Sequence, residues 1–121
     1  MKMPKPAKKS PACASDCPVR QTARLLDGKW TTLIIRDLLG GKKRYNELLK
    51  SLTGISPKML AARLKFLESE AIISKRIFPV IPPHTEYTLT TLGKKLARVI
   101  YAMRDFGNQL PKDRRTRTDN R

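Results

Sequence analysis

The sequence predicts an α+β fold that is mainly helical, and three observations support this. From about residue 18 to residue 70, apolar residues recur at helical spacing and are interrupted by capping residues and glycines. Beyond Ala71 the period changes to two over two short segments rich in branched and aromatic residues. A helical stripe returns over residues 92–106. Two helices joined by a tight turn, followed by a two-stranded hairpin, form a winged helix-turn-helix.

The first two helices are expected within residues 18–40. Pro18 stands at a first helical turn, where its missing N–H costs nothing, and Gly28 ends that helix. The apolar face of this helix carries Val19, Ala23 and Leu26. A second helix follows and ends at Gly40 and Gly41. Its apolar residues are Trp30, Leu33, Ile34 and Leu38.

The helix-turn-helix comes next. Asn46 is expected to cap a short helix that Gly54 ends. The apolar residues of that helix are Leu48, Leu49 and Leu52. After a brief turn, Ser56 caps another helix with Pro57 at its first position. The inner face of this second helix consists of Leu60, Leu64 and Leu67.

A wing and a last helix complete the domain. Strands are expected at residues 72–80 and 85–90, and the segment "IPPH" forms the turn between them. Thr90 or Thr91 then caps one long final helix. The apolar residues of this helix are Leu92, Leu96, Val99, Ile100, Met103 and Phe106. That stripe is wide for a helix that only covers a wing.

The charge of the chain points to a polyanionic partner. The formal net charge is +16, from 26 Lys and Arg against 10 Asp and Glu. Residues 1–16 and 112–121 hold +3 each, which leaves +10 on the segment from Cys17 to Leu110. We expect nucleic acid first and an anionic membrane surface second. A surface that is charged only for solubility would mix the two signs more evenly.

Several other classes of function are disfavoured. No apolar run approaches the roughly 20 residues that a membrane span needs, and the basic N-terminus has no apolar signal core. We therefore expect a cytoplasmic protein without a membrane partner. An enzymatic Cys17–His84 pair would have no third group to orient it. Together with Cys13, these residues are also too few for a structural zinc site, so we expect no metal and no cofactor.

The helix after Ser56 is the candidate for reading DNA, because an α-helix fits the major groove and its N-terminal half reaches the base edges. Its candidate contact residues are Ser56, Lys58, Met59, Ala62 and Arg63. Arg63 is the first choice for base contact, since its planar side chain can grip guanine. The alternative for Arg63 is an ion pair near Glu68 or Glu70, and core packing explains Met59 nearly as well.

Basic residues on either side of this helix are candidates for the DNA backbone and the adjacent groove. Before the helix-turn-helix these are Lys42, Lys43 and Arg44, and in the wing they are Lys75, Arg76 and His84. A run of charge is also commonly just a solvated face, so both interpretations stay open at this point.

Several motifs, taken together and in order, resemble the HxlR-type winged helix-turn-helix regulators of bacteria, relatives of the MarR group. These are "CPV", "GKW", the step from Gly41 to Tyr45, "GIS", "RL" and "PP–EYTLT–G", spread over residues 17–106. His84 stands where an Arg is common, Ala71 where a Gly is usual, and Phe106 where a Trp is common.

The resemblance implies a homodimeric transcription factor joined by its first and last helices, with the Ser56 helix as recognition helix and a wing tip at residues 82–85. Several members sense electrophiles or oxidants through the cysteine at the position of Cys17. That residue precedes Pro18 at a helix N-terminus, where the helix dipole favours a thiolate; the alternative is a small buried hydrophobe. Surplus apolar surface predicts a dimer interface at Val19, Ala23, Leu26, Ile100, Met103 and Phe106.

The chain is thus expected to comprise a flexible basic tail (1–16), an HxlR-type domain (17–110) and a second basic tail (111–121). The leading hypothesis is a sequence-specific repressor that binds double-stranded DNA as a homodimer on a pseudo-palindromic operator. The alternatives are a protein that coats nucleic acid without sequence preference and a winged helix that docks another protein.

Overall fold

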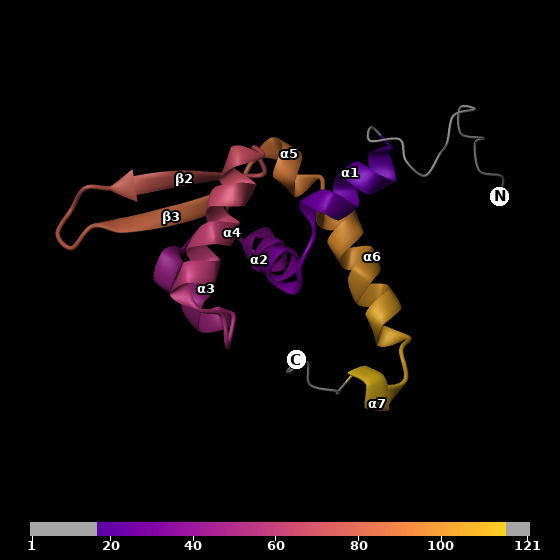
Figure 1. The fold of residues 1–121 in the computed structure, drawn as a ribbon. Helices are drawn as coiled ribbons and strands as arrows, with labels where there is room; N and C mark the ends of the chain where they lie inside the picture. Colours follow the sequence, from indigo (N-terminus) through magenta and orange to yellow (C-terminus); the bar gives the residue numbers. More distant parts are fainter. Residues whose placement is uncertain (1–16, 116–121) are drawn as a thin grey trace.

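The computed structural model describes residues 17–115, and of Arg114 and Arg115 it describes only the backbone (Figure 1). The elements are, in order, α1 (Pro18–Leu25), α2 (Lys29–Leu39), β1 (Lys43–Arg44), α3 (Tyr45–Ser51), α4 (Pro57–Ser69), β2 (Ile73–Phe78), β3 (His84–Leu89), α5 (Thr91–Lys94), α6 (Ala97–Asn108) and α7 (Lys112–Arg115). This mainly helical α+β architecture is the winged helix-turn-helix that the sequence predicts. The short helix α7 lies in a segment that the sequence assigns to a tail.

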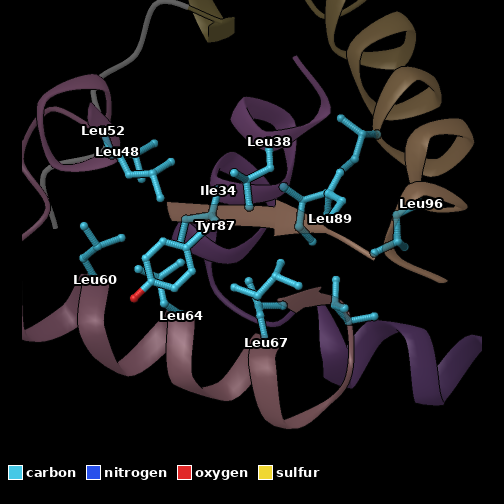
Figure 2. Packing of buried hydrophobic residues seen from close by; sticks show 14 of the residues in the cluster. Ile34, Leu38, Leu48, Leu52, Leu60, Leu64, Leu67, Tyr87, Leu89 and Leu96 are labelled. Atoms are coloured by element: carbon cyan, nitrogen blue, oxygen red, sulfur yellow. The ribbon is translucent and has the colours of Figure 1, made fainter. Parts of the chain in front are cut away.

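The core lies between α2, α3, α4 and the sheet. The inner face of α4 is the predicted one, because Leu60, Leu64 and Leu67 are all buried. Figure 2 shows these three side chains pointing toward Ile34 of α2 and Tyr87 of β3. Burial of such a leucine side chain stabilises the fold by about 1.5–3 kcal/mol, so this stripe fixes the orientation of α4. The opposite face of α4 is left to solvent.

The helix-turn-helix has one predicted cap and one that differs. The Ser56 hydroxyl accepts a hydrogen bond from the Met59 N–H (3.1 Å), as expected of an N-cap. The prediction of Asn46 as cap of α3 is wrong, because that helix begins at Tyr45. The Glu47 carboxylate instead accepts the Arg44 N–H (2.8 Å), so the helix is capped at Arg44, two residues earlier than predicted.

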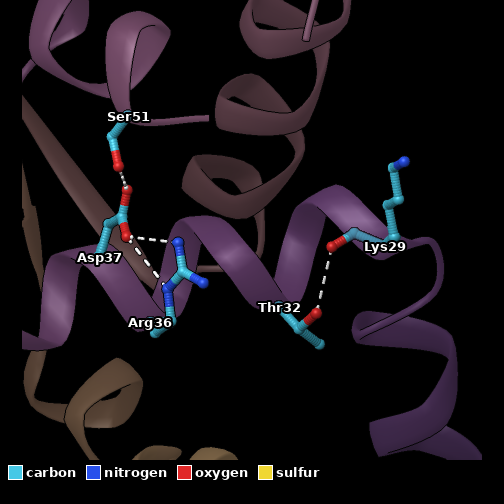
Figure 3. A network of polar contacts seen from close by, with 5 residues as sticks. All are labelled: Lys29, Thr32, Arg36, Asp37 and Ser51. Atoms are coloured by element: carbon cyan, nitrogen blue, oxygen red, sulfur yellow. Dashed lines mark hydrogen bonds and ion pairs between the residues drawn. The ribbon is translucent and has the colours of Figure 1, made fainter. Parts of the chain in front are cut away.

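Two polar contacts hold the helices of this motif together. The Asp37 carboxylate on α2 accepts a hydrogen bond from the Ser51 hydroxyl (2.6 Å), which joins α2 to the end of α3 (Figure 3). The same carboxylate accepts a hydrogen bond from the neighbouring Arg36 guanidinium on α2 (2.9 Å). At the other end of α3, the Tyr45 hydroxyl donates to the Pro57 carbonyl (3.2 Å). The start of α3 is therefore braced against the start of α4.

Helix α4 ends in a Schellman motif. The Ile72 N–H donates to the Leu67 carbonyl and the Ala71 N–H to the Glu68 carbonyl, both at 3.0 Å. Ala71 has a φ of 61°, in the left-handed region that favours glycine. Ile72 and Leu67 are both buried, which is the hydrophobic pairing typical of this motif. The sharp turn directs the chain from α4 straight into the wing.

The sheet has three antiparallel strands in the order β1-β3-β2, not the two that the sequence predicts. The additional strand β1 pairs Lys43 with Tyr87 and Arg44 with Glu86. His84, expected in the turn, is a strand residue that pairs with Phe78. Thr85 is also a strand residue and pairs with Ile77, as the two-residue period predicts, although the resemblance placed it in the wing tip. The loop between the long strands is therefore residues 79–83. A strand of two residues carries no periodicity, so its pairing could not be predicted.

The single long helix predicted near the C-terminus is divided into α5 and α6. Thr90 caps α5, with its hydroxyl oxygen accepting the Gly93 N–H (3.0 Å) and donating to the Ala71 carbonyl (2.7 Å). Any Cβ at position 93 would collide with the carbonyl oxygen of Ile72, so only glycine fits there. The backbone then tightens, since Leu96 N–H bonds to the Gly93 carbonyl three residues back. Helix α6 consequently leaves in a new direction and extends away from the sheet (Figure 1).

Candidate nucleic-acid interface

The outward face of α4 is polar and basic. Lys58, Ala62 and Lys65 are exposed along one line of the helix, and Ser56 is exposed at its cap. Lys65 was not among the predicted contact residues, although its spacing from Lys58 and Ala62 places it on the same face. The N-terminal backbone N–H groups and the helix dipole add to the positive potential here. This face can accept a polyanion.

Arg63 lies at the flank of this face and is half-buried. Its guanidinium carbon is 5.5 Å from the centre of the Phe66 ring, a cation–π contact that restricts the side chain. Its Nε is buried and makes no hydrogen bond within the part of the chain that the structure describes. The predicted alternative, an ion pair with Glu68 or Glu70, is not observed among the described residues, and Glu68 lies 3.9 Å from Lys75. Met59, for which core packing was the alternative, is exposed.

The register of the sheet divides the basic wing residues between two faces. Lys43 and Lys75 both pair with Tyr87 and lie on the face toward α4. Arg44 and Arg76 both pair with Glu86 and lie on the outer face. Side chains of successive strand residues point to opposite faces, so one run of cations in the sequence becomes two separate groups in the fold.

One carboxylate lies at the centre of the outer group. Glu86 is 3.8 Å from the Lys42 ammonium, 4.0 Å from the Arg44 guanidinium and 3.7 Å from His84 Nε2. His84 also stacks on Phe78, with ring centres 4.6 Å apart, and Arg76 lies over the same Phe78 ring at 4.9 Å. We call Lys42, Arg44, Arg76, His84 and Glu86 the wing cluster. Sequence reasoning missed Glu86, because its role depends on a register that the sequence does not give.

On the inner face, Tyr87 is the buried polar residue. Desolvation raises the pKa of the Tyr87 phenol above its ordinary value of 10.0, and the neighbouring Glu68 and Tyr45 raise it further. The phenol therefore stays neutral beside Lys43 and Lys75 at neutral pH. Tyr87 is part of the buried core, and the charged side chains on this face of the sheet are Lys43 and Lys75.

A hollow of about 690 Å³ separates the wing loop from the start of α3. Its walls come from Val80–Thr85 on one side and from Arg44–Glu47 on the other. Arg44 and His84 belong to both the hollow and the wing cluster. The space is open to solvent and large enough for a phosphate group together with water.

The predicted dimer residues do not all lie on the surface. Val19 is 76% exposed and Phe106 is 68% exposed, and Ala23 and Met103 are also exposed. Leu26 is half-buried against the core. Ile100 is buried within its own subunit, so it does not present apolar surface to a partner. Met103 and Phe106 border an apolar hollow of about 700 Å³ on α6.

Cys17 is the N-cap residue of α1 and carries a free, half-exposed thiol. Its carbonyl accepts the Gln21 N–H (2.9 Å), which is the first hydrogen bond of the helix. Cys13, its possible disulfide partner, lies outside the described residues. Within residues 17–115, no group of three or more His, Cys, Asp or Glu side chains is arranged to hold a metal ion. None of the described helices is long and apolar enough to cross a membrane.

Comparison with known proteins decides the family. The model of the HxlR-like helix-turn-helix matches residues 25–114. The chain belongs to the HxlR family. A relative named as an uncharacterized HTH-type transcriptional regulator, sll1512 of Synechocystis sp. (strain PCC 6803), is 41% identical over 92 residues, which are 76% of this chain and 68% of the relative.

Solved structures agree with this assignment to the HxlR family. A protein from Porphyromonas gingivalis W83 assigned to the MarR family of transcriptional regulators superposes with a TM-score of 0.78 at 41% identity. The alignment covers 81% of this chain and 96% of that one. The oxidised form of a protein described as the redox regulator HypR gives a TM-score of 0.74 at 32% identity, over 78% of this chain and 98% of that one. This HxlR-family chain is therefore a helix-turn-helix transcriptional regulator.

Proposed function

We propose that this HxlR-family protein is a sequence-specific repressor that binds a pseudo-palindromic operator as a homodimer in the cytoplasm. The observation that supports this most directly is the outward face of α4. It presents Lys58 and Lys65 beside Arg63, whose buried Nε has no hydrogen-bond partner among the described residues. A buried donor without a partner is unfavourable, and a base edge would supply an acceptor.

In this proposal α4 enters the major groove. Arg63 contacts a base, while Ser56 and Lys58 at the helix N-terminus hold a backbone phosphate. Lys42 and Arg44, on the outer face of the sheet, lie against the adjacent backbone, and Lys43 approaches it from the face toward α4. The hollow between Arg44 and the wing loop gives room for one phosphate of that strand.

The homodimer follows from geometry and from exposed apolar surface. Two recognition helices must lie about 34 Å apart to enter successive major grooves, and a two-fold axis provides this. The apolar surface available for the contact is Val19 and Ala23 on α1 and Met103 and Phe106 on α6. Ile100 is left out of the proposed interface, because it serves the core of its own subunit.

Selection from a randomised duplex library tests sequence specificity. A regulator should enrich one sequence with two related halves, and it should retain that duplex against a thousandfold excess of unrelated DNA. Enrichment of no sequence, with binding lost to any competitor, would favour a protein that coats nucleic acid. Transcription in vitro from a promoter that carries the selected sequence would then test repression.

We further propose Cys17 as the site of a redox or electrophile response. The similar protein HypR is a redox regulator, which supports a response of the same kind here. Cys17 is half-exposed at the start of α1, next to the proposed interface. Diamide or a quinone should weaken binding of the selected duplex by wild-type protein and leave Cys17→Ser unaffected. Unchanged wild-type binding, with the thiols shown to have reacted, would make Cys17 a structural residue.

A further inference from the structure

The position of Glu86 in the sheet distinguishes it from the other acidic residues. It lies on the central strand β3, where Arg44 of β1 pairs with it on one side and Arg76 of β2 on the other. Residues directly opposite in antiparallel strands share a face. Lys42 and His84 also approach its carboxylate, at 3.8 and 3.7 Å. One negative charge is thus surrounded by the basic side chains of the wing cluster.

The exposures of these side chains show how they are layered. The Glu86 side chain is 16% exposed, whereas that of Lys42 is 70% and that of Arg44 is 55% exposed. The carboxylate lies beneath, and the cations lie between it and solvent. A DNA phosphate that approaches this face contacts the cations, and the negative charge of the carboxylate behind them weakens their attraction for it.

These ion pairs are weak contributors to stability. Their separations of 3.7–4.0 Å are beyond good hydrogen-bond distance, and the Lys42 and Arg44 side chains that pair with the partly buried carboxylate are themselves exposed. The main effect of Glu86 is therefore on the electrostatic potential. Attraction to phosphates supplies essentially all of the binding to random DNA, and a chain of charge +16 has this attraction in excess.

We propose that Glu86 is a specificity-determining residue that limits the binding of random DNA by the wing. It neutralises part of the wing cluster, so that a larger share of the binding free energy comes from the base contacts of α4. The inference rests on the proposed DNA-binding function and deepens it. In this inference Glu86, an acidic residue on a basic surface, helps the protein to discriminate between operator and bulk DNA.

The test compares wild type with Glu86→Gln on a mixed-sequence 20-base-pair duplex over a series of salt concentrations. Removing the negative charge frees about one cation for phosphate contact. The slope of log affinity against log salt should steepen by about 0.9, and affinity at 0.1 M salt should rise roughly five- to tenfold. On the duplex selected by wild-type protein, affinity should rise less, so that the ratio of specific to random binding falls.

Two further variants control the interpretation. Asp105→Asn makes the same change in net charge on α6, where Asp105 pairs with Arg104 away from the wing, and it should leave the slope unchanged. The double variant Glu86→Gln/Lys42→Gln should restore the wild-type slope, because it removes one cation together with the one negative charge.

Three results would overturn the proposal: an unchanged slope for Glu86→Gln, a fall in its affinity for random DNA, or an equal steepening for Asp105→Asn. Each of these results is a binding measurement on the mixed-sequence duplex. Failure of the proposed regulatory function is seen separately, as the absence of any selected sequence.

Discussion

At the scale of single residues, Arg63 carries the clearest prediction. Arg63→Ala should weaken binding of the selected duplex by about 1–3 kcal/mol and relax the preference at one base pair in each half-site, as loss of a bidentate base contact does. The measurement is fluorescence anisotropy against a panel of single-base variants. Because the Arg63 Nε makes no hydrogen bond within the described residues, the substitution removes no internal hydrogen bond of that atom from the free protein.

Lys58→Ala is the matched control on the same helix. It should weaken selected and random duplexes alike and reduce the salt slope by about 0.9, since it removes a phosphate contact. If Arg63→Ala behaves like Lys58→Ala, then Arg63 contacts the backbone and the base reader lies elsewhere on α4.

Ala71 gives a prediction about stability. With φ at 61° it occupies a left-handed conformation, which costs an L-residue about 1–2 kcal/mol. Glycine would remove this cost, but it also raises the conformational entropy of the unfolded chain, which cancels part of the gain in stability. Ala71→Gly should therefore raise the free energy of unfolding by about 0.5–1 kcal/mol. Urea denaturation measures this. Gly54→Ala, at a φ of 96°, is the mirror experiment and should destabilise; a destabilised Ala71→Gly would refute the strain interpretation.

At the scale of elements, strand β3 makes the fold sensitive to high pH. The pKa of Tyr87 is raised in the folded state, so between the unfolded and folded pKa values the unfolded chain binds fewer protons than the folded one. The contribution of Tyr87 to stability is complete below pH 10 and is lost as the pH rises above that value. Urea midpoints at pH 9 and pH 11 should fall more steeply for wild type than for Tyr87→Phe. Parallel declines would contradict this.

The helices were predictable because their signals are local. Ser56 and Pro57 lie at the start of α4, which they determine, and the leucines that define its buried face lie within the helix itself. The contact candidates on the outer face of α4 follow from the same helical period. The strand β1 and the division between α5 and α6 were not predictable. The first depends on pairing with residues more than forty positions away, and the second on the approach of Gly93 to Ile72.

The candidate site was predictable to the same extent. Residues of α4 share a face by helical period alone. The wing cations are adjacent in sequence, but the register with Glu86 and Tyr87 separates them into two groups, and register is a property of the folded sheet. Ile100 was misassigned to the interface because an apolar residue on α6 can serve either side of that helix.

At the scale of the whole molecule, the proposed dimer depends on α6. Phe106→Asp places a charge in the exposed apolar surface and should give monomers in sedimentation velocity at micromolar concentration. Binding of the full selected duplex should fall by at least a hundredfold, because both halves can no longer be held at once. Tyr101→Asp, outside the apolar hollow of α6, is the control and should remain dimeric. A dimeric Phe106→Asp would move the interface to another surface.

The junction of α5 with the end of α4 has a thermodynamic consequence. The Thr90 hydroxyl donates a hydrogen bond to the Ala71 carbonyl, and Gly93 packs against the Ile72 carbonyl. A displacement that begins in the terminal helices is therefore transmitted to the end of α4 through direct contact. Coupling between two sites is reciprocal. If modification of Cys17 lowers operator affinity by some factor, bound operator lowers the equilibrium constant for that modification by the same factor. Genes under this control would then respond at a higher oxidant level when operator sites are saturated, and the abundance of the protein relative to its sites would set the threshold.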